Sequence, residues 1–198
     1  MIEYRALTTI PPLVKRAKNL AKQIGSFKVC SDQTGRLLQI LASQIPSGVI
    51  GEIGCGCSVA SAWLSNAISP ATSFFIVESN PAAAATAGAL FAPMLNVRVI
   101  HSKWREFLNY WQFSMFYASP TSARDTEPEL FLKALRPGGL IILDGVTPLQ
   151  KQPDNLHSDN IRDFWLNDER LISSEIMVSE NENIILATLK TREEQTEN

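Results

Sequence analysis

Short apolar runs alternate with helical stretches along most of the chain, and this alternation constrains the fold more than any other feature. The runs with the character of buried strands are 48–53, 73–77, 97–100, 113–118 and 140–143. Stretches typical of helices lie between them, at 59–67, 82–90, 104–110 and 127–135. Apolar strands separated by helices indicate a parallel sheet covered on both faces. We therefore predict a doubly wound, Rossmann-like α/β fold.

The two ends of the chain depart from this alternation. Residues 12–24 and 33–43 have helical patterns, the second capped by Ser31 or Asp32, so 11–44 is expected to hold N-terminal helices. The strand-like runs 175–179 and 184–189 are separated by only four residues, which makes them an antiparallel hairpin, since a parallel crossover needs a dozen or more. The predicted sheet thus has seven mostly parallel strands. No repeat or linker divides residues 1–198, so we expect a single domain.

Composition excludes several classes of partner. The 198 residues are 45% hydrophobic and 19% charged, as in ordinary globular domains, and the formal net charge is −2. This balance argues against nucleic acid, and no apolar run reaches the ~18 residues of a membrane span. The odd number of cysteines, three, and the absence of a signal-like apolar run after the first residues suggest a cytoplasmic protein. A small-molecule substrate is the expected partner.

The segment 51–58 (GEIGCGCS) ends a strand and opens a helix, which makes it the most informative stretch for function. Gly54 and Gly56 permit a tight turn and close approach of the backbone to a ligand. Cys55 and Cys57 could ligate a metal, but no second pair lies at zinc spacing, so we interpret them as small residues of the turn.

Glu78 ends the next strand, 22 residues after Gly56, where a carboxylate can accept hydrogen bonds from the hydroxyls of a ribose. Together, the glycine turn and Glu78 predict a ligand that carries a ribose. The NAD-binding fingerprint requires a third glycine at the position of Val59, and it has no acidic residue at the position of Glu52. The terminal hairpin is also foreign to a plain dinucleotide fold, so NAD is the weaker candidate.

These residues resemble a known superfamily. The segment 52–56 (EIGCG) is similar to motif I of class I S-adenosylmethionine-dependent methyltransferases, and Glu78 matches their ribose-binding acid. The segment 135–142 (LRPGGLII) resembles the motif before their fifth strand, and the hairpin matches their last two strands. The resemblance covers about 31–190 and implies S-adenosylmethionine as cofactor.

Residues 31–38 (SDQTGRLL) further resemble the catechol and caffeoyl-CoA type O-methyltransferases. That resemblance implies that Cys30 and Ser31 lie at the methionine end of the cofactor, Glu78 with Ser79 at the ribose, and Lys103 with Trp104 at the adenine. As the first aromatic residue of a helix, Trp104 fits a core position equally well. The full expected cofactor set is Cys30, Ser31, Glu52, Ile53, Gly54, Cys55, Gly56, Ser58, Glu78, Ser79, Lys103, Trp104 and Ala118.

The chain also departs from that branch, which holds a divalent metal with an Asp after strand four and an Asp-Asn pair after strand five. The corresponding positions here are Ala118 and the pair Asp144 and Gly145. One carboxylate cannot supply the oxygen ligands that Mg²⁺ needs, so we expect no metal. The lysine of the branch is replaced by Thr121, the glycine that closes motif I by Ser58, and a serine two residues later by Ala60.

Asp144 is the candidate catalytic base, because it follows the fifth strand on the side where substrate should lie; a loop-capping role is an equal alternative. Tyr117 is either a substrate-orienting group or a buried strand aromatic. His101 is expected to be structural, whereas His157 and Arg124 lie in polar segments that could cover an active site.

The sequence therefore predicts a methyltransferase that acts on a small molecule without a metal. The alternative is a catalytically inactive relative that binds S-adenosylmethionine or S-adenosylhomocysteine as a sensor or partner subunit. A homodimer through the N-terminal helices is an expectation from the resemblance alone.

Overall fold

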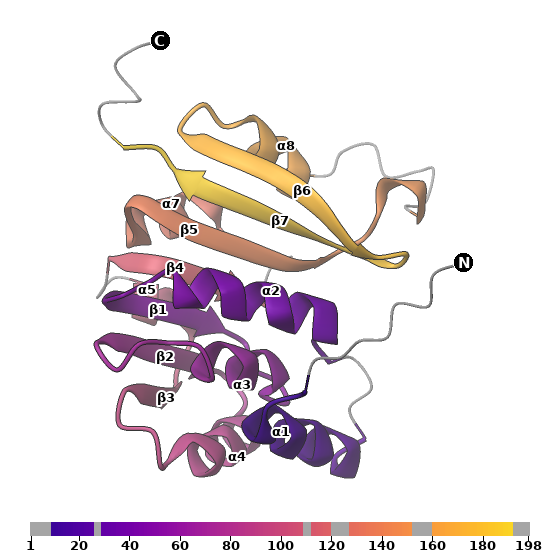
Figure 1. The fold of residues 1–198 in the computed structure, drawn as a ribbon. Helices are drawn as coiled ribbons and strands as arrows, with labels where there is room; N and C mark the ends of the chain where they lie inside the picture. Colours follow the sequence, from indigo (N-terminus) through magenta and orange to yellow (C-terminus); the bar gives the residue numbers. More distant parts are fainter. Residues whose placement is uncertain (1–8, 26–28, 109–111, 120–126, 152–159, 192–198) are drawn as a thin grey trace.

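A seven-stranded sheet with strand order β3-β2-β1-β4-β5-β7-β6 organises the computed structural model (Figure 1). The structure describes residues 9–25, 29–108, 112–119, 127–151 and 160–191. The first five strands are parallel, and β7 pairs antiparallel with both β5 and β6. The strands are β1 (Gly48–Ile53), β2 (Thr72–Glu78), β3 (Val97–His101), β4 (Phe113–Ala118), β5 (Leu135–Val146), β6 (Leu171–Ser179) and β7 (Glu182–Leu189). The structure thus confirms the predicted fold class and its C-terminal hairpin.

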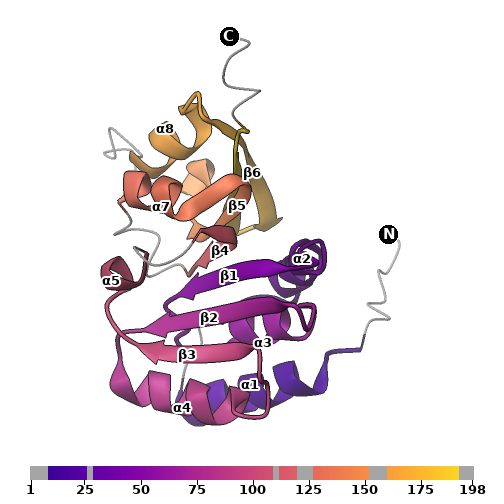
Figure 2. The same cartoon turned by 90° about the vertical axis from the view of Figure 1, so that its left-hand side faces the viewer.

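Helices cover both faces of the sheet (Figures 1 and 2). One face carries α1 (Pro12–Gln23), α2 (Asp32–Ser43), α3 (Val59–Ser65) and α4 (Pro81–Phe91). The other carries α5 (Trp104–Leu108), α7 (Pro128–Ala134) and α8 (Asn160–Asn167). A short 3-10 helix, η1 (Leu149–Lys151), follows β5.

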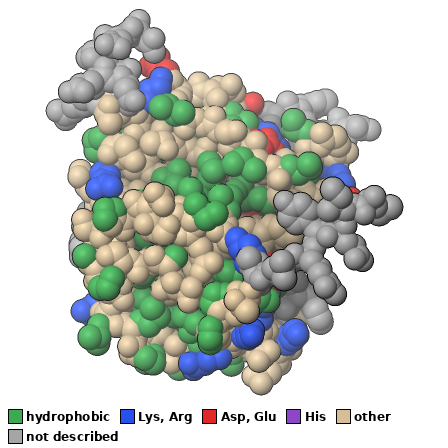
Figure 3. All heavy atoms as spheres, viewed as in Figure 1, with side chains coloured by type: hydrophobic (Ala, Val, Ile, Leu, Met, Phe, Trp, Pro, Cys, Tyr) green, Lys and Arg blue, Asp and Glu red, His purple; other side chains and the backbone are tan. Residues whose placement is uncertain are grey.

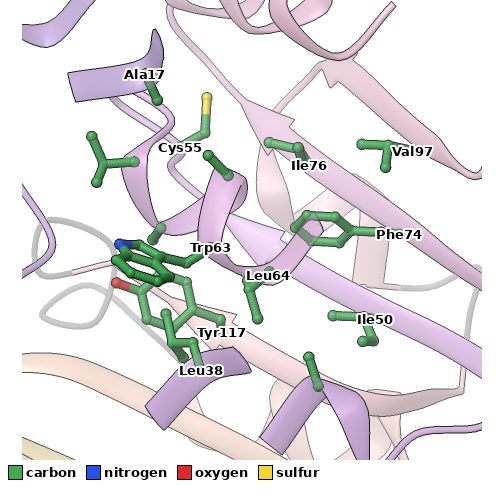
Figure 4. Close-up of a cluster of buried hydrophobic side chains, with 14 of the residues drawn as sticks. Ala17, Leu38, Ile50, Cys55, Trp63, Leu64, Phe74, Ile76, Val97 and Tyr117 are labelled. Atoms are coloured by element: carbon green, nitrogen blue, oxygen red, sulfur yellow. The ribbon is translucent and has the colours of Figure 1, made fainter. Parts of the chain in front are cut away.

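Side chains that alternate along the strands divide the core into two clusters. Phe74 and Ile76 of β2 pack against α3 and α4, whereas Phe75 and Val77 of the same strand pack on the opposite face. Figure 4 shows part of the first cluster, which includes Trp63 and Tyr117. A continuous apolar run is therefore needed along each central strand, as the sequence shows.

Local signals fix the helix boundaries. The Oγ of Ser31 accepts a hydrogen bond from the backbone N–H of Thr34 at 3.1 Å, so Ser31 rather than Asp32 is the N-cap of α2. Asn80 caps α4 in the same way. Gly25, with φ of 69°, follows the end of α1.

The strand β5 begins earlier than the predicted start at residue 140. Leu135 already pairs with Phe113, and the next pair joins Met115 to Leu140, so the Pro-Gly-Gly turn forms a bulge inside the ladder. Glycine is required there, because Gly138 has φ of +72° and a Cβ on Gly139 would lie 2.7 Å from the carbonyl oxygen of Arg136.

Part of the molecular surface over α2 and the β6–β7 hairpin is hydrophobic (Figure 3). Hydrophobic side chains gather over α2 and the hairpin (Figure 3), and Ile40 of α2 and Ile172 of β6 are exposed. Among the described helices, none is long and apolar enough to cross a membrane.

Candidate functional site

The candidate site lies at the carboxyl ends of the central strands. Ile53, the last residue of β1, is in register with Val77 of β2 on one side and Ala118 of β4 on the other. The chain leaves β1 toward β2 and returns later to β4, so this point is the topological switch of the sheet. In open α/β sheets, ligands bind in the crevice at that position.

The glycine turn between β1 and α3 has three residues in the left-handed region. Gly54, Gly56 and Ser58 have φ values of 73°, 48° and 62°. The N–H of Gly54 donates to the carbonyl of Val77 at 2.8 Å, and that of Ser58 donates to the carbonyl of Cys55 at 2.6 Å. Ser58 thus adopts a left-handed conformation that glycine adopts more readily. Gly56 is exposed with open space beside it, so its backbone can approach a ligand closely.

Glu78 holds this turn against β2. One carboxylate oxygen accepts the N–H of Gly56 at 3.0 Å, and the other accepts the N–H of Asn80 at 2.8 Å. The oxygen that accepts the N–H of Asn80 keeps a further lone pair, so the carboxylate can still accept a hydrogen bond from a ribose hydroxyl. Ser79 beside it is exposed, and its carbonyl oxygen lies 3.1 Å from Nε2 of His101. This contact agrees with a structural role for His101.

Glu52 lies on the same face of the sheet, 1% exposed. Neither of its carboxylate oxygens has a hydrogen-bond partner among the described residues. Burial raises the pKa of Glu52 to about 8, and the charges of Glu78 and Asp144 add to the effect. The hydroxyl of Ser61 is near enough to offset part of this pKa shift but makes no hydrogen bond.

Tyr117 and Asp144 form a buried hydrogen-bonded pair across β4 and β5. The Tyr117 hydroxyl donates to one oxygen of Asp144, and the N–H of Gly145 donates to the other at 2.8 Å. The pairing of β5 with β7 is irregular between Leu143 and Val146, and Gly145 has φ of 68°. This irregularity lies at the site, where bulges commonly re-aim a side chain. Burial raises the pKa of Asp144, although its hydrogen bonds oppose the shift.

The sequence did not point to Glu182, the first residue of β7. Its carboxyl group interacts with Asp144, and burial together with that interaction raises the pKa of Glu182. Side chains alternate between the two faces along a strand, so Glu182 lies on the same face as Ile184, which packs in the first core cluster. Using this alternation requires knowing that β7 lies beside β5.

The cysteines also gather near the site. Burial, followed by the charges of Asp144, Glu182 and Glu52, raises the pKa of the Cys30 thiol. The segment before α2 therefore lies beside the carboxyl groups, whereas contact of Cys30 and Ser31 with the cofactor stays a prediction. Cys55 is buried, lies 3.6 Å from an oxygen of Glu78, and has a raised pKa because of burial. All three cysteines are free.

Trp104 has partners in the protein itself. Its ring stacks on Phe131 of α7 with centroids 5.4 Å apart, and the Arg105 guanidinium lies 4.7 Å from its centroid. These contacts agree with the core alternative, and its role toward adenine stays a prediction. Lys103 precedes α5 and is exposed. The residues Thr121, Arg124 and His157 lie outside the described part of the chain.

The described side chains do not form the metal site of the branch. Ala118 is buried and has no ligand atom, Gly145 has no side chain, and Asp144 already accepts two hydrogen bonds. Within the described residues, no group of three His, Cys, Asp or Glu side chains could hold a metal ion. The residues present therefore do not fit Mg²⁺.

Comparison with known proteins places the fold. The sequence matches no protein-family model and no curated protein. Among solved structures, an O-methyltransferase from Bacillus cereus in complex with SAH is 20% identical, with a TM-score of 0.75 over 93% of this chain and 94% of that one. The O-methyltransferase TomG from Streptomyces achromogenes, involved in tomaymycin synthesis and solved with SAM, is 19% identical, with a TM-score of 0.76 over 94% and 93%.

A putative caffeoyl-CoA O-methyltransferase from Staphylococcus aureus is 17% identical, with a TM-score of 0.68 over 89% of this chain and 91% of that one. All three likenesses span nearly the whole of both chains. They agree with the resemblance that motif I, Glu78 and the closing hairpin suggested. The chain has the fold of the class I S-adenosylmethionine-dependent O-methyltransferases.

Proposed function

We propose that this protein is an S-adenosylmethionine-dependent methyltransferase that acts on a small-molecule acceptor without a metal. The observation that carries the proposal is the glycine turn held by Glu78 at the switch point of the sheet. The B. cereus and S. achromogenes proteins of the same fold were solved with SAH and SAM. A nucleoside with an amino-acid tail is therefore the ligand that best suits this turn.

Three of the described residues would each bind a different part of the cofactor. Glu78 would accept the ribose hydroxyls while it keeps the turn in place, and the exposed backbone of Gly56 would lie against the ligand. Glu52, with no partner of its own, would face the ammonium of the methionine end. The bound cofactor supplies a methyl group activated by a sulfonium.

The acceptor would lie beside Tyr117 and Asp144. In methyl transfer, a lone pair of the acceptor attacks the methyl carbon and the carbon–sulfur bond breaks toward sulfur, so the acceptor must lose a proton. Asp144 would take that proton, and Tyr117, which donates a hydrogen bond to it, would orient the acceptor or the carboxylate. The neighbouring carboxyl group of Glu182 favours an acceptor that presents a hydroxyl or amino group.

One observation favours the second candidate, a protein that binds the cofactor without methyl transfer. Asp144 already accepts hydrogen bonds from Tyr117 and Gly145, and the metal positions of the branch are lost. Such a protein would act as a sensor or partner subunit. It shares the cofactor site with the first candidate and differs from it only in turnover.

Calorimetric titration with S-adenosylmethionine and S-adenosylhomocysteine, with Mg²⁺ and with EDTA, tests the common claim. The proposal expects binding in the micromolar range that does not depend on Mg²⁺. Transfer of a labelled methyl group to a panel of small hydroxyl and amino compounds then separates the two candidates. Failure to bind either ligand contradicts both, whereas binding that requires Mg²⁺ contradicts metal independence.

A further inference from the structure

Glu52 is the one buried carboxyl group of the site that the described hydrogen bonds leave without a partner. It is 1% exposed, and both of its oxygens lack a donor among the described residues. Glu78, by contrast, accepts hydrogen bonds from two backbone N–H groups and from the Cys55 thiol, and Asp144 accepts from Tyr117 and Gly145. Burial of an ionised carboxylate without a partner is strongly unfavourable, so a carboxyl group in this position takes up a proton instead.

The groups that act on the charge of Glu52 come from α3, β2 and β5, and none of these three is a cation. Burial is the main reason that the pKa of Glu52 is raised. The Ser61 hydroxyl of α3 opposes this shift, whereas the carboxyl groups of Glu78 on β2 and Asp144 on β5 add to it. The charge of Glu52 in turn raises the pKa of three further groups: the thiols of Cys30 and Cys55 and the hydroxyl of Tyr117. These neighbours are acidic or neutral, so the described surroundings favour the protonated form of Glu52.

We propose that Glu52 carries a proton in the ligand-free protein and releases it when the ammonium of the cofactor's methionine end binds. The inference rests on the proposed function and adds a proton to its binding step. A neutral carboxyl group and an ammonium become a carboxylate–ammonium pair, and one proton leaves to solvent. The ligand thereby supplies a cation, which the described groups that act on Glu52 do not.

This coupling makes affinity depend on pH in one direction. Below the point where Glu52 ionises in the free protein, each unit of lower pH adds to the work of removing the proton. Affinity for S-adenosylhomocysteine should therefore fall about tenfold per pH unit in that range. A carboxylate that was already ionised would give no such slope.

Calorimetry of S-adenosylhomocysteine binding at pH 6.5, in buffers of different ionisation enthalpy, counts the released protons. The wild-type protein should release about one proton per site. Glu52→Gln, which keeps the shape and removes the ionisation, should release about one fewer. Asp163→Asn, which removes an exposed carboxyl group of α8 on the opposite face of the sheet, should leave the released proton in place.

The outcomes separate this inference from the function on which it rests. Binding without proton release, or release that persists in Glu52→Gln, overturns the inference alone. Absence of any binding by the wild-type protein overturns the proposed function and the inference with it. Infrared difference spectroscopy of the wild-type protein provides a second readout, since the band of a protonated carboxyl group should disappear when the ligand binds.

Discussion

Ser58 shows how a single residue keeps a conformation that its side chain opposes. It opens α3 with φ of 62°, the only non-glycine residue with a positive φ in the described part of the chain. The left-handed region costs an L-residue roughly 1–2 kcal/mol, so Ser58 adopts an intrinsically unfavourable backbone conformation in this turn. The demand for this conformation comes from the approach of the turn to β2, where Glu78 binds Gly56.

Substitution of Ser58 tests that strain. Ser58→Gly should raise the free energy of unfolding by up to about 1 kcal/mol, because relief of strain exceeds the added freedom of the unfolded chain. Ser58→Ala keeps the Cβ and should give no gain. Urea denaturation of both variants measures the difference, and a Gly variant less stable than the Ala variant would show that strain is not the issue.

The raised pKa of Glu52 predicts that the stability of the ligand-free protein depends on pH. Its pKa is raised from 4.5 to about 8, so its contribution to stability is fully present below about pH 4.5 and is lost as pH rises toward 8. Each pKa unit corresponds to about 1.4 kcal/mol, so the loss is on the order of a few kcal/mol. Glu52→Gln should therefore gain stability relative to wild type between pH 5 and pH 8, as measured by urea denaturation. An unchanged difference at the two pH values would mean that Glu52 does not titrate in this range.

Glu78 should matter for binding more than any other side chain of the site. Glu78→Ala removes the acceptor for the ribose and for the N–H groups of Gly56 and Asn80. Since hydrogen bonds to charged groups contribute about 1.5–3 kcal/mol, S-adenosylhomocysteine should bind roughly 10- to 100-fold more weakly. Ser73→Ala, an exposed position near the start of the same strand β2 and away from the glycine turn, is the control for calorimetry. Equal affinities of the two variants would remove Glu78 from the cofactor site.

At the scale of elements, the irregular pairing of β5 brings the reactive groups together. The carboxyl ends of β4 and β5 supply Tyr117 and Asp144, and β7 supplies Glu182. The side chains of Glu52, Glu78 and Tyr117 follow the same alternation as Ile50, Ile76 and Met115, which pack under α2 and α3. One face of the sheet therefore provides both the core and the site.

Asp144→Asn should separate binding from chemistry. If Asp144 takes the acceptor's proton, the variant should lose about 10²–10⁴-fold in kcat while its affinity for S-adenosylmethionine changes little. Tyr117→Phe removes the hydrogen bond to Asp144 and should lower kcat less. Single-turnover methyl transfer and calorimetry on the same preparations make the comparison. A kcat that is unaffected by Asp144→Asn would leave the aspartate a loop-capping role.

Much of the fold, and the contact between the glycine turn and Glu78, could be predicted from the sequence, because both depend on local patterns. The strands Gly48–Ile53 and Phe113–Ala118 have the predicted bounds, and the glycine turn faces Glu78 as spacing suggested. The early start of β5 was missed, since a Pro-Gly-Gly turn normally interrupts a strand and only pairing with Phe113 converts it to a bulge. Glu182 was missed for a similar reason: its place beside Asp144 depends on non-local strand order.

At the scale of the whole molecule, the face formed by α2 and the hairpin stays apolar at its surface. Ile40 and Ile172 are 61% and 57% exposed there. A homodimer remains a prediction, and this face is where we expect it. Ile40→Glu should shift the sedimentation coefficient from dimer to monomer, while the exposed Leu95→Glu should not. A monomeric wild-type protein at micromolar concentration would contradict the prediction.

The central claim is that one face of this sheet binds S-adenosylmethionine through the glycine turn, Glu78 and Glu52. A crystal structure of the complex with S-adenosylhomocysteine tests it most directly. The account predicts ribose hydroxyls on Glu78, the ligand against the backbone of Gly56 and the ammonium beside Glu52. A ligand bound elsewhere, or one whose ribose does not reach Glu78, would contradict it.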